Sequence, residues 1–255
     1  MQIKILYQDP HLLVIDKPFG IVVNRADTVK EDTVQDWVEA ELKINPPANA
    51  LRKQMRAGDL RLKNKDNEDF YNRSGIVHRL DKETSGCLII AKDFDSFIKL
   101  QQAFKNHAVK KEYIALVHGQ LKITSGDINV PIGRLPWNRE RFGVVPGGKA
   151  SHTKFLVTNF YQKDKENFSL LKLMPTTGRT HQIRVHLKYL GYPIVGDYLY
   201  AGRKLQAHDR KWCPRVFLHA TKISFPHPQT EKEVTIEAKL PLDLLQILES
   251  LTKIN

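Results

Sequence analysis

The sequence predicts a single α+β domain over residues 1–255 with a mixed β-sheet. Strand-like and helix-like segments interleave without the regular strand–helix–strand rhythm of a doubly wound fold. No Gly/Ser-rich linker and no internal repeat divides the chain. At 255 residues it is also long enough to bury a sizeable core. These three observations favour one mixed domain over two small ones.

The first 74 residues contain strands, a helix and then a polar segment. Residues 4–24 are typical of short strands interrupted by turns at Asp9-Pro10 and Pro18. Thr33 is a predicted N-cap for a helix that ends near Lys43, because apolar residues recur at helical spacing after it. Residues 45–74 are poor in apolar side chains and mostly basic, which predicts a mobile loop. That loop could be a solvated linker or a segment that contacts RNA.

The rest of the chain alternates strands and helices. In order, we expect a helix capped by Asp93 or Asp95, a strand at 110–121, strands around a basic turn at 134–149, a further strand, a helix from Thr180 to Gly191, a hairpin at 216–240 and a final helix at 241–251.

The charge balance is unusual for a globular protein. Lys and Arg number 40 against 28 Asp and Glu, a formal net charge of +12. A protein this basic usually binds a polyanion, so nucleic acid is favoured over an acidic membrane surface. The sequence contains no apolar run of membrane-spanning length and no signal peptide, so we expect a cytoplasmic protein. Its two cysteines are expected to be reduced thiols, although a disulfide between them stays open.

The densest charge cluster lies directly before a buried strand, in GIVHRLDKETSGCLIIAK (75–92). Asp81 has Arg79 and Lys82 as close neighbours, and cations keep a carboxylate ionised. An ionised Asp suits a nucleophile or a base, and it equally suits a structural ion pair. The small residues after it permit a sharp turn into the apolar run at 87–91.

A second polar cluster starts the helix in TGRTHQIRVH (177–186). Helical spacing places His181, Arg184 and Lys188 on the side away from the apolar stripe. An Arg near a helix N-terminus is disfavoured by the helix dipole, so Arg184 should have a carboxylate partner such as Asp81. The alternative is a basic face turned to solvent.

Motifs for metals and cofactors are missing from the sequence. The histidines form no i, i+4 pair around a Glu, and neither cysteine belongs to a CxxC. A GxxxxGK[ST] phosphate loop and a GxSxG nucleophile turn are also missing. We therefore expect neither a metal nor a cofactor.

Five segments resemble one enzyme family. HRLDKETSGCLIIAK (78–92) resembles the catalytic motif of the RluA-type RNA pseudouridine synthases. Residues 16–24, 110–119, 173–200 and 217–228 resemble four other blocks of that family, in family order. The resemblance implies a mixed, mainly antiparallel central sheet flanked by helices and loops. It also implies an isomerase that converts a specific uridine of structured RNA to pseudouridine without a cofactor.

The resemblance also implies roles for individual residues. Asp81 would attack the flipped-out nucleotide, either at the ribose or at the base. Tyr113 would pack against the target base and assist proton removal at carbon 5, and Arg184 would pair with Asp81. Arg79 would fill the space that the flipped base leaves. The other residues expected near the RNA are His78, Thr84, Leu218, Arg179 and His181.

The expected partner is rRNA, tRNA or both, with no membrane and with the protein as a monomer. The first family block begins at residue 16, so we expect no separate N-terminal RNA-binding domain. The catalytic domain would then hold the RNA itself, with the segments at 45–74 and 134–149. Two rivals remain. A non-catalytic RNA-binding protein on the same fold should have lost Asp81, and a metal-dependent nuclease should have several convergent carboxylates.

Overall fold

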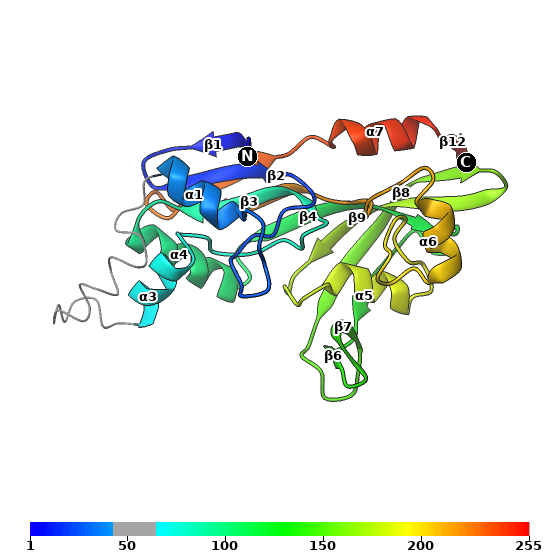
Figure 1. Cartoon of the computed structure of the whole chain (residues 1–255), viewed down its shortest axis with the longest axis horizontal. Helices are drawn as coiled ribbons and strands as arrows, with labels where there is room; N and C mark the ends of the chain where they lie inside the picture. The colour runs from blue at the N-terminus through cyan, green and yellow to red at the C-terminus, as the bar shows by residue number, and fades with distance from the viewer. Residues whose placement is uncertain (43–64, 255) are drawn as a thin grey trace. The chain divides into compact units, whose positions relative to one another are not determined.

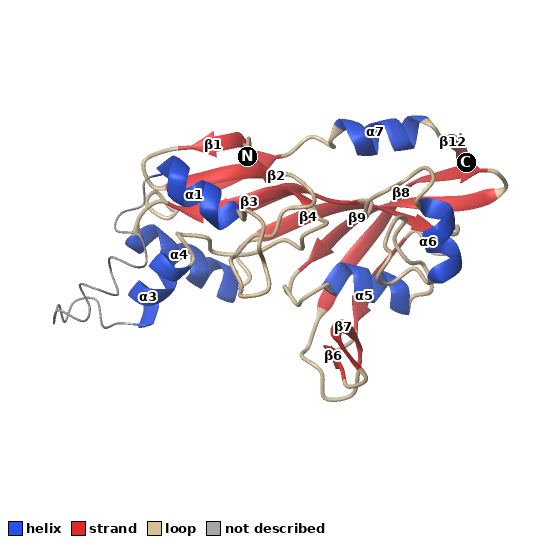
Figure 2. Cartoon of the chain, in the orientation of Figure 1, coloured by secondary structure: helices blue, strands red, loops and turns tan. Residues whose placement is uncertain are grey.

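The computed structural model describes residues 1–42 and 65–254, and these form two compact units (Figure 1). The first unit comprises Met1–Val109 and Ser224–Glu237, and the second comprises Lys110–Ile223 and Ala238–Asn255. Both combine antiparallel strands with helices (Figure 2), so the predicted α+β class is confirmed. The assignment of residues 1–255 to one domain stays a prediction.

The first unit is built on an antiparallel sheet whose strands β2 and β3 are buried. Strand β2 pairs with β1 on one side and with β3 on the other, and every residue of β3 is buried. Helix α4 contacts β3, and its side chains Phe97 and Leu100 are buried. The elements of this unit are β1 (Lys4–Gln8), β2 (Leu12–Lys17), α1 (Val34–Leu42), α3 (Lys65–Asn72), β3 (Ser85–Ala91), α4 (Phe94–Lys105) and β11 (Glu233–Glu237).

Both helix caps expected in this unit can be located. Asp93 accepts a hydrogen bond from the Ser96 N–H at 2.8 Å, so Asp93 rather than Asp95 caps α4. At α1, the Thr33 hydroxyl accepts from the Asp36 N–H at 3.2 Å, and the Asp36 carboxylate accepts from the Thr33 N–H at 2.8 Å. This reciprocal pair satisfies two backbone donors that the helix itself leaves unpaired.

The loop expected at 45–74 needs correction at its end. Residues 45–64 lie outside the described residues, but Lys65–Asn72 forms helix α3, so the loop prediction is wrong there. Phe70 of this helix is 4% exposed, and its ring packs edge-on against Phe94 and Phe97 at centroid distances of 6.3 and 5.5 Å. Packing of this one aromatic side chain stabilises a helix whose composition is otherwise polar.

Gly75 lets the chain reach β3 immediately before the charged cluster. Its φ is +75°, and its carbonyl accepts from the Ala91 N–H at 2.8 Å. A Cβ atom at this position would lie 2.0 Å from the Ala91 carbonyl oxygen. Only glycine fits this close approach.

Gly75→Ala is therefore expected to lower the free energy of unfolding by about 2–5 kcal/mol. About 1–2 kcal/mol comes from the left-handed backbone and about 1–3 kcal/mol from the steric overlap. Urea denaturation of purified variants measures the loss. Gly20→Ala is the matched control, because Gly20 has a φ of +80° but open space around it. Equal losses in the two variants would show that the overlap with Ala91 costs nothing.

Asp9 ties the N-terminal strands to a segment near the C-terminus. Its carboxylate accepts hydrogen bonds from the Tyr7 hydroxyl at 2.8 Å, the N–H groups of His11 and Leu12 at 2.7 and 2.9 Å, and His227 Nε2 at 2.8 Å. Burial by itself would raise the pKa of Asp9, but these hydrogen bonds outweigh it and lower the pKa to about 2.

The depressed pKa of Asp9 predicts a specific loss of stability in acid. An unfolded Asp titrates near pH 4, so the ionised form favours the folded state by about 2–3 kcal/mol above that pH. This contribution should fall away as the pH drops from about 4 through about 2. Urea unfolding of the wild type and Asp9→Asn should differ most above pH 4 and converge toward pH 2. A difference that stays constant over this range would contradict the assignment.

The second unit carries the larger sheet. Strand β9 pairs with β4 and β8, and β8 also pairs with β12 and β5, all antiparallel. The elements are β4 (Lys110–His118), β5 (Ser125–Asn129), β6 (Ile132–Leu135), β7 (Asn138–Val144), β8 (His152–Lys163), β9 (Glu166–Pro175), α5 (Gln182–Tyr189), α6 (Arg203–Asp209), α7 (Leu242–Glu249) and β12 (Thr252–Ile254). Strand β10 (Leu218–Pro226) has residues in both units.

Two sequence predictions in this unit are corrected. The segment at 134–149, expected as a turn region, contains most of an antiparallel hairpin of β6 and β7. Helix α5 begins at Gln182, with His181 in the left-handed region before it, so Thr180 is not its cap. The predicted end is confirmed, because Gly191 has a φ of +86° and its N–H donates to the Lys188 carbonyl at 2.9 Å.

The two cysteines and the lengths of the helices bear on two further predictions. Cys87 and Cys213 are both buried and are not joined in a disulfide, as expected. Over residues 1–42 and 65–254, we find no helix with the length and apolar character needed to cross a membrane.

Candidate functional site

The turn that carries Asp81 stands at the start of a rigid strand. The Thr84 N–H donates to the Asp81 carbonyl at 3.1 Å, which closes a tight turn one residue before β3. The Asp81 side chain is half-buried, and the strand that follows is buried along its whole length. The backbone that carries the Asp81 carboxylate is therefore held in place by the turn and by β3.

A buried lysine holds this turn from behind. Lys17, at the end of β2, is 0% exposed, and its ammonium donates to the carbonyls of Pro18, Lys82 and Thr84 at 2.8, 3.2 and 2.9 Å. Gly20 adds a backbone hydrogen bond to the Lys82 carbonyl at 2.8 Å. A buried ammonium must be satisfied in this way, and two of the three carbonyls that it bonds, those of Lys82 and Thr84, belong to the Asp81 turn. Sequence reasoning missed this role, although Lys17 lies within the 16–24 block.

The other predicted residues of the first unit differ in exposure. His78 Nε2 accepts from the Ile89 N–H at 2.9 Å, and its ring lies 4.7 Å from that of Phe104. His78 thus fastens the segment before the turn to β3. Arg79 is exposed, whereas Thr84 is buried within the turn. Contacts of these side chains with RNA stay predictions.

Tyr113 projects from β4 in the second unit. It lies opposite Leu173 of β9, and Lys111 precedes it on the same face of the strand. The Lys111 ammonium donates to the Thr177 carbonyl at 3.3 Å, and burial lowers the pKa of Lys111 to about 8. Lys111 is therefore still mainly charged at pH 7 and connects the strand of Tyr113 to the loop before α5.

Arg184 is buried, contrary to its predicted place on a polar face. It is 4% exposed, and its Nε and Nη2 donate to the two carboxylate oxygens of Asp197, both at 2.8 Å. The inference that Arg184 has a carboxylate partner is confirmed, and Asp197 is such a partner. The pairing with Asp81 stays a prediction. Sequence reasoning missed Asp197, whose only signal was its place in the 173–200 block.

Tyr200 connects helix α5 to the β6–β7 hairpin. Its hydroxyl is 2.9 Å from His181 Nδ1 and accepts from the Phe142 N–H at 3.1 Å. The Arg184 guanidinium lies 5.0 Å from the centre of the Tyr200 ring, and the Lys188 ammonium lies 5.8 Å from it. The ring thus lies among the cations of α5 and fixes the helix to β7.

The loop before α5 is held by the buried side chain of Gln182. Its Oε1 accepts from the Thr177 hydroxyl at 2.7 Å and the Arg179 N–H at 3.0 Å, and its Nε2 donates to the His152 carbonyl at 2.9 Å. Arg179 is exposed, and its Nε donates to the Ala150 carbonyl at 3.1 Å. The loop therefore presents Arg179 to solvent from a fixed backbone.

The structure thus brings the predicted residues together in two sets. The Asp81 turn and the segment before it carry His78, Arg79, Asp81 and Thr84 in the first unit. The second unit carries Tyr113 on β4 and groups Arg179, His181 and Arg184 at α5. Leu218 belongs to the second unit and is buried in its core. A catalytic role for Asp81, Tyr113 and Arg184 stays a prediction.

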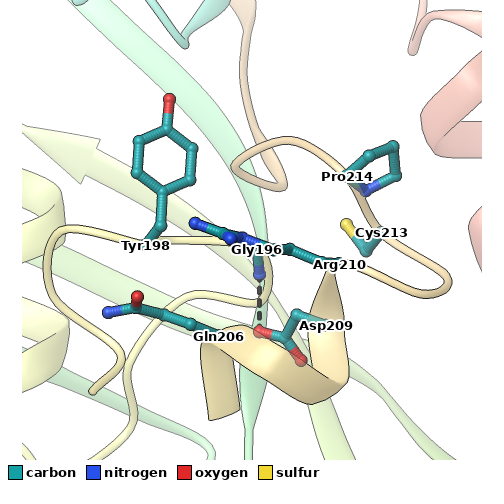
Figure 3. Close-up of a pocket in the computed structure, with 7 residues that line it drawn as sticks. All are labelled: Gly196, Tyr198, Gln206, Asp209, Arg210, Cys213 and Pro214. Atoms are coloured by element: carbon teal, nitrogen blue, oxygen red, sulfur yellow. Dashed lines mark hydrogen bonds between the residues drawn. The ribbon is translucent and has the colours of Figure 1, made fainter. Parts of the chain in front are cut away.

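A pocket in the second unit is lined by none of these predicted residues. Its volume is about 390 Å³, and Figure 3 shows its lining, which is Gly196, Tyr198, Gln206, Asp209, Arg210, Cys213 and Pro214. Asp209 is buried, and its Oδ2 accepts from the Gly196 N–H at 2.8 Å and pairs with His118 Nε2 at 2.9 Å. The wall of this pocket therefore supports the turn that leads into Asp197.

The described residues offer no ready-made metal site. In residues 1–42 and 65–254, no three His, Cys, Asp or Glu side chains gather closely enough to hold an ion. The two sets supply the Asp81 carboxylate on a tight turn, the aromatic ring of Tyr113 on β4 and the exposed cations Arg79 and Arg179.

Comparisons with known proteins point to one family. A model of the RNA pseudouridylate synthases matches residues 11–189. An uncharacterized RNA pseudouridine synthase of Bacillus subtilis is 35% identical over 253 residues, covering 99% of this chain and 74% of the relative. Ribosomal large subunit pseudouridine synthase C of Vibrio parahaemolyticus is 34% identical over 252 residues, covering 98% and 70%. Synthase D of Pseudomonas aeruginosa is 33% identical over 261 residues, covering 98% and 72%.

A solved structure shows the same fold. The human RNA pseudouridylate synthase domain containing 4 superposes with a TM-score of 0.68 and 23% identity, covering 99% of this chain and 95% of the human chain.

Proposed function

Because the chain belongs to the RNA pseudouridylate synthase family and is thus an RNA pseudouridine synthase, we propose that Asp81 is the residue that attacks its target uridine. The isomerisation breaks the bond between uracil N1 and the ribose and forms a bond from carbon 5 to the ribose, while carbon 5 loses a proton and N1 gains one. The bond that Asp81 forms to the nucleotide is broken again before the product leaves. The reaction is redox-neutral and therefore consumes no oxidant or reductant, and the proposed mechanism uses neither a cofactor nor a metal.

The observation that carries this proposal is the fixed turn of Asp81. Carbon 5 and the glycosidic bond are inaccessible within a base stack, so the nucleotide has to leave the helix at a cost of a few kcal/mol. A carboxylate on a turn held by the buried Lys17 ammonium is positioned before the nucleotide arrives. Little further ordering of the protein is then needed when the reaction begins.

We further propose roles for the second set of residues. Tyr113 packs on the extruded base and assists removal of the proton at carbon 5, and base–aromatic stacking contributes about 1–3 kcal/mol. Arg184 pairs with Asp81 through the part of its guanidinium that Asp197 does not bind. The exposed Arg79 occupies the space that the base leaves.

The proposed substrate is structured RNA, with rRNA as the first pool to test. Two of the relatives are named as synthases of the ribosomal large subunit, and tRNA is the second pool. The net charge of +12 supplies phosphate attraction that does not depend on sequence. The protein would act as a monomer and would grip the RNA partly through the basic segment at 134–149.

Tritium release tests the proposal. Total rRNA and tRNA transcripts labelled at carbon 5 of uridine are incubated with the wild type and Asp81→Ala, both in EDTA. Release from at least one pool by the wild type, and none by the variant, is the expected result. The wild type is also assayed without EDTA, and release that occurs only there would contradict the metal-free mechanism. RNA binding without release would favour the non-catalytic RNA-binding rival.

A further inference from the structure

The β6–β7 hairpin has a firmly packed base. Ile132 of β6 forms a buried cluster with Val185 of α5 and Tyr200, and Val144 of β7 packs against it. Ile132 also exchanges two backbone hydrogen bonds with Lys149, at 2.9 and 2.8 Å. In Figure 1 the hairpin extends away from α5, so its base is anchored while its tip projects. Such an element can hold a side chain at a fixed distance from α5.

The tip of the hairpin exposes a tryptophan. Leu135 pairs with Asn138, which leaves Pro136 and Trp137 as the two residues of the turn. Trp137 is 79% exposed, more than any other large hydrophobic residue among those described. Burial of such a side chain is worth about 1.5–3 kcal/mol, and the fold does not gain this here. The exposed ring is therefore available to a partner.

The charge of the hairpin indicates what that partner is. Residues 132–149 contain four basic residues and a single acidic one in the sequence. Arg134 and Lys149 are exposed, and the Arg134 guanidinium lies 5.3 Å from the centre of the Phe142 ring on the opposite strand. An exposed aromatic ring and exposed cations on one segment are a combination that binds single-stranded nucleic acid, because bases stack on the ring and phosphates meet the charges.

We propose that Trp137 stacks on an unpaired base of the substrate RNA outside the target nucleotide, while Arg134 and Lys149 bind phosphates of the same RNA. The proposal deepens the proposed function and rests on it. The Phe142 N–H of the hairpin donates a hydrogen bond to the Tyr200 hydroxyl, and the Tyr200 ring contacts the Arg184 guanidinium. A base held by Trp137 therefore lies at a fixed offset from Arg184, and this offset selects which uridine is presented.

The test measures RNA binding separately from catalysis. The probe is a fluorescein-labelled 20-nucleotide single-stranded RNA of mixed sequence, followed by anisotropy at several KCl concentrations. Trp137→Ala should raise the Kd about 5–150-fold, the equivalent of one lost stacked base. Trp137→Phe should retain most of the affinity. Arg134→Gln should instead reduce the slope of log Kd against log salt by about one, because it removes a phosphate contact.

Controls separate this proposal from folding and from the proposed function. Ile123→Ala removes another exposed apolar side chain of the same unit and should leave the Kd unchanged. Asp81→Ala should bind the probe like the wild type. If the wild type released no tritium but Trp137→Ala still weakened RNA binding, only the catalytic role of Asp81 would be overturned, and the stacking proposal would stand. A Kd for Trp137→Ala within twofold of the wild type would overturn the stacking proposal. The stacking proposal would also be overturned if the wild type did not bind the probe. It would be overturned, too, if Trp137→Ala changed only the oligomeric state of the protein and not its affinity for RNA.

Discussion

Asp81→Ala is expected to lose at least about 10⁴-fold in the rate of tritium release while it folds and binds RNA like the wild type. The size of the loss follows from removing the group that attacks the nucleotide. The fold should survive because the hydrogen bonds that hold the turn use backbone carbonyls. Thr84 N–H bonds to the Asp81 carbonyl, and Lys17 bonds to those of Lys82 and Thr84.

Single-turnover assays with excess enzyme measure this rate, and urea denaturation measures the fold. Asp95→Ala is the matched control, since Asp95 is an exposed carboxylate in the same unit and lies outside the Asp81 turn. It should release tritium at the wild-type rate. If Asp81→Ala retained a tenth of the wild-type rate, Asp81 would be a positioning residue and another group would have to attack the nucleotide.

The sequence was informative where local patterns decide the structure. Asp93 caps α4 because an Asp before an amphipathic segment satisfies the first N–H groups of a helix in almost any context. The alternation of β4 and the glycine that ends α5 are local signals of the same kind. Helix α3 gave no such signal, because its stability depends on Phe70 packing against residues of α4.

The site shows the same division. The positions of Asp81, Tyr113 and Arg184 could be chosen because five sequence blocks resemble one family. The residues that hold them in place could not be predicted from the sequence, because a lysine is normally solvated and an isolated Asp has no distinctive sequence pattern. Lys17 and Asp197 are both 0% exposed, and only three-dimensional contacts reveal their partners.

Arg184→Met is expected to lower the free energy of unfolding by about 3–5 kcal/mol. The substitution leaves the Asp197 carboxylate buried without its cation, and breaking one side of a buried ion pair is strongly destabilising. Urea denaturation measures the loss. Arg134→Met is the matched control, because Arg134 is exposed, and it should change stability by less than about 0.5 kcal/mol. A loss below about 1 kcal/mol for Arg184→Met would show that the ion pair contributes little.

A double variant separates the structural role of Arg184 from its catalytic one. In the wild type, Asp197 Oδ1 accepts hydrogen bonds from the N–H groups of Leu199 and Tyr200, both at 3.1 Å. Asp197→Asn removes the charge but keeps a side-chain oxygen that can accept these two hydrogen bonds. Combined with Arg184→Met, it should recover much of the lost stability, since neither charge is then buried alone. If Arg184 also pairs with Asp81, tritium release should stay low in this stabilised variant. Recovery of both properties would instead confine Arg184 to supporting the fold.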